Sequence, residues 1–88
     1  MSSTREEGIE RMKVAASRHP VRLLAGSLEV LDRKPKLDDA ERLTRAVLID
    51  VICEQCPAAD EAFEAWAQSD DTDLKAPVAA IIAIAKAS

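Results

Sequence analysis

The apolar positions of this chain recur at helical spacing. One stripe follows the three- and four-residue steps of a buried helix face, at Val21, Leu24, Leu28 and Leu31. The sequence contains no sustained apolar–polar alternation and no Asn-Gly or Asp-Gly turn, so no strand or hairpin is predicted. Prolines and polar clusters divide the chain into five predicted helices, at residues 5–17, 20–33, 39–55, 57–68 and beyond a polar loop at 69–73.

The predicted helix at residues 39–55 is expected at the centre of the domain. The run at residues 46–53 in its second half is apolar nearly all round, with Asp50 as the single charge of that run, and such a helix is usually buried on every side. We expect Asp50 and Glu54, one turn apart, to mark its solvent-exposed edge. At the other end, Asp38 and Glu41 have the spacing of a capping box.

The fold prediction is therefore an all-α, compact bundle of four to five short helices with helix 39–55 central. Short connections favour packing between helices that follow each other in sequence. The chain has 88 residues and a mass of 9.5 kDa, which suits a single domain at 1–88, with residues 1–4 expected to fray. A chain of this size buries only about 60–65% of its unfolded surface, so a partner or a second copy would add needed stability.

Charge is distributed unevenly around a net value of −4. Residues 1–37 carry eight basic and five acidic side chains, whereas residues 38–88 carry four basic and eleven acidic ones. This polarity would help to orient a partner or a second copy. The first seven residues include acids and no apolar stretch, and the longest apolar run has ten residues, so we expect a cytoplasmic protein without a membrane partner.

No residue set indicates an enzyme, a cofactor or a metal. Gly8 and Gly26 stand alone in their segments, so no phosphate-binding glycine loop is present, and His19 is the single histidine. Cys53 and Cys56 form a CxxC pair, but Cys53 lies at the C-terminal end of a predicted helix, where the helix dipole opposes a thiolate. We interpret the two cysteines as small core residues; the alternative is a thiol or metal protein that shares them across a dimer.

A second alternative is a small DNA-binding regulator with a helix-turn-helix-like segment at residues 20–55. Basic side chains cluster around its turn, at Arg33, Lys34, Lys36, Arg42 and Arg45. A recognition helix presents its N-terminal residues to the bases, however, and here those are Asp38, Asp39 and Glu41, which phosphates repel. Nucleic acid is therefore not the expected partner.

The predicted helix at residues 20–33 carries a second apolar set. Leu23 and Val30 lie opposite the buried stripe, with Gly26 between them. Apolar residues around a small one permit close helix approach, so Leu23, Gly26 and Val30 are either intramolecular core or a partner interface. Our leading hypothesis is a non-enzymatic protein–protein interaction module that binds a protein partner or itself and forms a homodimer.

Overall fold

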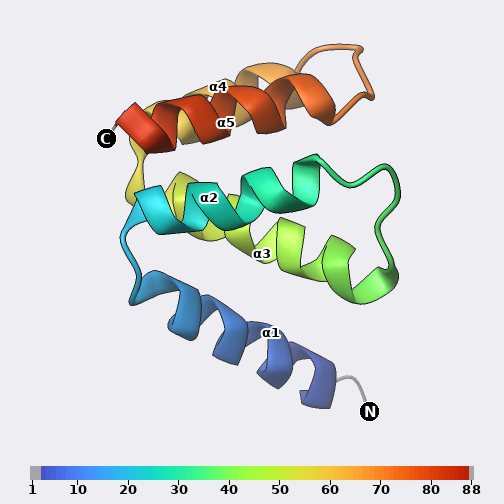
Figure 1. The fold of residues 1–88 in the computed structure, drawn as a ribbon, viewed down its shortest axis with the longest axis vertical. Coiled ribbons are helices and arrows are strands. Elements are labelled where there is room, and N and C mark those ends of the chain that lie inside the picture. The colour runs from blue at the N-terminus through green and yellow to red at the C-terminus, as the bar shows by residue number, and fades with distance from the viewer. Residues whose placement is uncertain (1–2, 88) are drawn as a thin grey trace.

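Five helices form the described part of the chain, and Figure 1 shows their arrangement in the computed structural model. The structure describes the backbone of residues 3–87 and the side chains of residues 6–87, and this part of the chain contains no strand. The all-α prediction is confirmed. The helices are α1 (Ser3–Ser17), α2 (Val21–Asp32), α3 (Asp39–Gln55), α4 (Pro57–Ala67) and α5 (Lys75–Ala87).

The first four residues are the segment that was expected to fray. Met1 and Ser2 lie outside the described residues. The backbone of Ser3 and Thr4 forms the start of α1.

α3 lies at the centre, as predicted, because it packs against each of the other four helices. Its second half supplies a large share of the core, through Val47, Leu48, Ile49, Val51 and Ile52. The predicted capping box is also present at its start. The Asp38 carboxylate accepts a hydrogen bond from the Glu41 backbone N–H at 2.7 Å, and the Glu41 carboxylate accepts one from the Asp38 N–H at 3.2 Å.

The most extensive helix pair is α2 with α5, which are far apart in sequence. Leu28 and Ile81 are fully buried in the core that these helices share with α3. Ala25 and Ala85 are also fully buried, and their small side chains permit a close approach of the helices.

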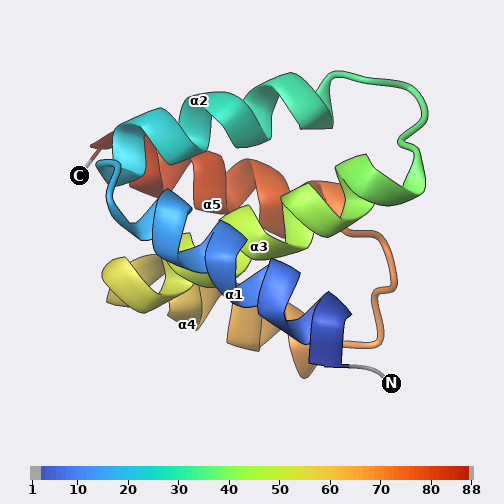
Figure 2. The ribbon, with the colours of Figure 1, turned by 90° about the horizontal axis from the view of Figure 1, so that it is seen from below.

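This arrangement corrects the expectation that sequential neighbours pack on each other. That expectation is right for α2 with α3, α3 with α4 and α4 with α5, but α1 packs chiefly on α3 and not on α2. The reason lies in the connection, where α1 ends before His19 and the extended conformation of Pro20 (φ −65°, ψ 150°) redirects the chain. α1 therefore lies at the periphery, across the central helix (Figure 2).

Two polar contacts attach α1 to α3. The Lys13 ammonium lies 2.6 Å from the Asp50 carboxylate, and the Gln55 side-chain amide donates to the Ser17 carbonyl at 3.3 Å. The hydrogen bond to Asp50 raises the pKa of Lys13. Asp50 and Glu54 are both exposed, so they mark the solvent-exposed edge of α3 as predicted.

We expect opposite behaviour from two leucines of α2. Leu28 is 0% exposed, so Leu28→Ala would leave a cavity between α2, α3 and α5 and lower the free energy of unfolding by about 2–5 kcal/mol. Leu23 is 59% exposed, so Leu23→Ala would change the stability of the monomer by less than about 0.5 kcal/mol. Urea unfolding of dilute protein, followed by the fluorescence of the single tryptophan Trp66, measures both. Equal losses would contradict the assignment of the two faces.

Candidate functional site

The outer face of α2 is defined here as Leu23, Gly26 and Val30. Its two large apolar side chains are open to solvent, and Gly26 between them is half-buried. Leu24, Ala25 and Leu28 on the opposite side are 4%, 0% and 0% exposed, whereas Leu23 and Val30 are 59% and 57% exposed. Figure 2 shows α2 at the edge of the bundle, with no helix beyond it. The two large apolar side chains therefore do not belong to the core of this chain.

Neither the backbone conformation nor the packing around Gly26 excludes an alanine at this position. Its φ is not positive, and a Cβ built on it would meet nothing within 4 Å. Glycine inside a helix costs about 0.5–1 kcal/mol relative to alanine. Since neither backbone conformation nor internal packing requires glycine here, its effect is that no side chain stands on the α2 backbone between Leu23 and Val30.

A second feature lies at one end of the bundle, where the α2–α3 and α4–α5 loops come together (Figures 1 and 2). Residues of both loops line a pocket of about 280 Å³. We call it the basic pocket because five cationic side chains line it and only two carboxylates, Asp32 and Asp73, do. The cationic set is Lys34, Lys36, Arg42, Arg45 and Lys75.

Four of the five basic residues singled out from the sequence thus meet in one place. Arg33 does not line the pocket, and its guanidinium lies 3.5 Å from the Glu29 carboxylate instead. Lys75 was missed. It follows the α4–α5 loop, and no local pattern indicates that this loop meets the α2–α3 loop.

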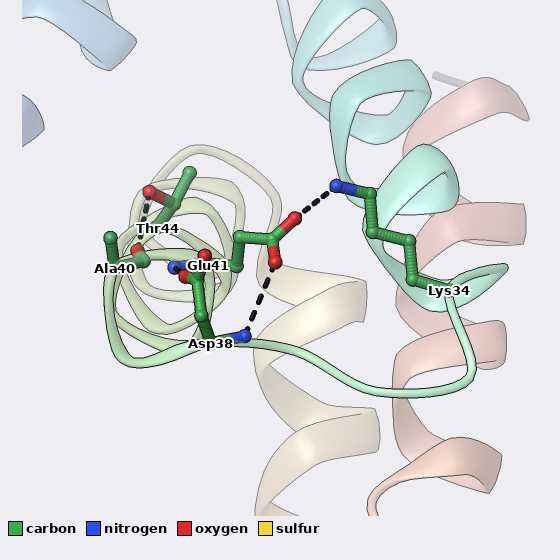
Figure 3. Close-up of polar contacts among 5 residues, drawn as sticks. All are labelled: Lys34, Asp38, Ala40, Glu41 and Thr44. Atoms are coloured by element: carbon green, nitrogen blue, oxygen red, sulfur yellow. Dashed lines mark hydrogen bonds and ion pairs between the residues drawn. The ribbon is translucent and has the colours of Figure 1, made fainter.

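The α2–α3 loop is held in place at both ends (Figure 3). The Lys34 ammonium donates to the Glu41 carboxylate, which also takes part in the α3 capping box. This hydrogen bond raises the pKa of Lys34 and, together with the Asp38 backbone N–H, lowers that of Glu41. Leu37 is buried a few residues further along. Lys36 therefore lies between two anchored positions on the rim of the basic pocket.

A second, more apolar pocket of about 360 Å³ lies between α3 and α4. Ile49, Cys53 and Phe63 are among its lining residues, and the Phe63 ring centroid lies 5.5 Å from that of Trp66. Arg42, Arg45 and Leu74 line both pockets, so the two are neighbours. Its lining has charges of both signs, from the two arginines and from Asp50, Asp60 and Glu64, but no ion pair joins these arginines to these carboxylates in the described structure.

The cysteines are free thiols at the junction of α3 and α4. Cys53 is half-buried, and Cys56 is buried between the two helices. Burial, reinforced by the charges of Asp60 and Asp50, raises the pKa of the Cys53 thiol to about 11. Among the residues that the structure describes, no three histidine, cysteine or acidic side chains are grouped to hold a metal ion.

Comparisons with protein-family models, curated proteins and solved structures found no match to this chain. In the described part of the chain, no helix has both the length and the apolar character needed to cross a membrane. The function must therefore be argued from the geometry of the outer face of α2 and of the basic pocket.

We expect the Cys53 thiol to react slowly with iodoacetamide. Because its pKa is raised from 9.0 to about 11, its thiolate fraction at pH 8 would be about 100-fold below that of an ordinary cysteine. Peptide mass spectrometry after timed alkylation measures the rate at each cysteine, with the urea-unfolded protein as control. The rate at Cys53 should still be rising steeply between pH 10 and 11, whereas a rate that is half-maximal near pH 9 and levels off by about pH 10 would show an ordinary thiol.

Proposed function

We propose that this protein is a non-enzymatic interaction module that self-associates through the outer face of α2. The observation that carries the proposal is the combination of two large apolar side chains, each more than half exposed, with a glycine that the chain does not need internally. Large exposed apolar residues on a small protein favour association, because contact removes their surface from water. Glycine lets a second backbone approach closely.

The spacing of the three residues fits a second copy of the same chain. Leu23 and Val30 lie seven residues, or about two helical turns, apart, and Gly26 lies near their midpoint. A two-fold axis at this midpoint would pair two antiparallel α2 helices. Leu23 of each copy would then meet Val30 of the other, with the glycines at the crossing point.

Such an interface is small. α2 has 12 residues and is therefore about 18 Å long, so the two helices would cross over a short distance. Interfaces at the low end of the size range belong mainly to transient complexes. We therefore expect a reversible dimer whose population depends on protein concentration.

The two alternatives have less support. A DNA-binding role would place α3 against phosphates, yet the carboxylates of Asp38, Asp39 and Glu41 stand at its start. Salt-dependent binding to duplex DNA tests that role. For a shared thiol or metal site, the raised pKa of Cys53 disfavours the thiolate that a metal requires. A native mass spectrum of reduced, chelator-free protein reports subunit number and bound ions together.

Gly26→Ala should have opposite effects on folding and on association. The added methyl group has free space in the monomer and improves helix propensity, so monomer stability should rise by about 0.5–1 kcal/mol. The same methyl group would separate two helices that cross at Gly26, so dimerisation should weaken. Sedimentation equilibrium and urea unfolding of dilute protein measure the two effects.

Gly8→Ala is the matched control, because a Cβ at Gly8 also meets nothing within 4 Å and the residue lies on α1. It should stabilise the monomer and leave association unchanged. If Gly26→Ala dimerises as well as the unaltered protein, α2 does not form the crossing.

Leu23→Asp should weaken dimerisation at least about tenfold, because it places a charge in an apolar contact that occurs twice in a symmetric dimer. The helical content measured by circular dichroism should stay the same, since Leu23 is exposed in the monomer. Val14→Asp makes a similar change at a 50% exposed position on α1 and should not affect dimerisation. Equal effects of the two variants on the sedimentation profile would refute a specific α2 interface.

A further inference from the structure

We propose that the basic pocket binds the phosphate group of a small phosphorylated molecule. This inference is independent of self-association, because it concerns the end of the bundle where the two longer loops meet. It rests on a half-buried Arg45 whose guanidinium has no partner in the described structure. The other cationic side chains and the small volume of the basic pocket support it.

Arg45 is half-buried, yet its guanidinium has no ion pair or hydrogen bond among the described residues. Partial removal of a cation from water is unfavourable unless an anion or hydrogen-bond acceptor compensates. Arg42 is three residues earlier on the same face of α3 and lines the same pocket. Its nearest carboxylate, Asp39, is a fully exposed neighbour at 3.6 Å, so this ion pair is loose.

Two lysines extend this cationic surface to the loops. Lys36 from the α2–α3 loop and Lys75 from the start of α5 line the pocket, and neither ammonium group has an ion pair in the described structure. Guanidinium groups bind phosphate with paired N–H donors, and lysines add point charges. Two arginines and two lysines can therefore balance the two negative charges of a phosphate monoester.

The two carboxylates of the pocket limit the size of the anion. The Asp73 carboxylate accepts a hydrogen bond from the Lys75 backbone N–H at 3.0 Å, which fixes its position but leaves its negative charge on the lining. Asp32 is half-buried at the end of α2 and stays as a negative charge on the lining. Because both carboxylates keep their charge, an anion with many charges that filled the whole pocket would be repelled more strongly than a single phosphate group.

The rest of the lining suits a compact ligand with some apolar character. Its apolar side chains are Leu31, Pro35, Leu37, Leu74 and Val78. The volume of about 280 Å³ is near the lower limit for small-molecule sites. A long polyanion such as duplex DNA would in addition meet the carboxylates at the start of α3 and the net charge of −4.

The test is a titration with inorganic phosphate and with pyrophosphate at constant ionic strength, with sodium chloride as the reference. Backbone amide chemical shifts in two-dimensional NMR spectra are followed for Lys34, Lys36, Leu37 and residues 42–45 and 73–75. We expect saturable shifts confined to these segments. Arg45→Gln and Lys36→Gln should each weaken phosphate binding about tenfold, as the loss of a charge-assisted hydrogen bond predicts.

Arg18→Gln is the matched control. Arg18 is an exposed arginine of the α1–α2 turn, which lies at the opposite end of the bundle (Figure 1), so its loss should not change phosphate binding. Lys36→Gln changes an exposed loop residue, so it tests the pocket even if Arg45→Gln alters the fold.

Three results would overturn the proposal. They are linear shifts without saturation, equal responses to phosphate and chloride, and unchanged affinity in both the Arg45 and Lys36 variants. Binding of a DNA duplex without binding of phosphate or pyrophosphate would assign the pocket to nucleic acid instead. Repeating the titration with Leu23→Asp separates this proposal from self-association, because phosphate binding should be the same in that variant.

Discussion

The packing of α2 against α5 is the interaction on which the rest of this structure depends. Leu28 and Ile81 are fully buried there, and two fully buried alanines permit the close approach of the helices. Because this contact buries one side of α2, it turns the side with Leu23 and Val30 toward solvent. The same contact brings the end of α2 beside the start of α5, and the α2–α3 and α4–α5 loops then meet to form the basic pocket. Both candidate sites are therefore consequences of one contact.

The local structure of this protein could be predicted from its sequence because it depends on local chemistry. Helical spacing of apolar residues placed all five helices, with bounds close to the observed ones, and the Asp38–Glu41 spacing predicted the capping box. The apolar residues around Asp50 placed α3 at the centre. The packing of helices that are far apart in sequence could not be predicted from local patterns. The short loops suggested that helices adjacent in sequence pack together. This is wrong for α1 with α2, and it did not predict that α2 and α5 form the most extensive helix pair.

The candidate sites could be predicted only in part, for the same physical reason. The sequence shows that Leu23 and Val30 share a face, but whether a helix covers that face depends on long-range packing. The four basic residues of the pocket near the α2–α3 loop were visible as a cluster, whereas Lys75 joins them from more than 25 residues away. The open space beside Gly26 is likewise a property of the fold, since only the packed structure shows that no neighbour reaches a Cβ there.

The central claim is that the outer face of α2 is covered by a second copy. Its most direct measurement is an isotope-filtered nuclear Overhauser experiment on a concentrated mixture of differently labelled protein. The account predicts contacts between the methyl groups of Leu23 in one copy and those of Val30 in the other, because the proposed two-fold axis passes near Gly26. A protein that shows no such contacts and stays monomeric at the millimolar concentration of the sample would contradict it.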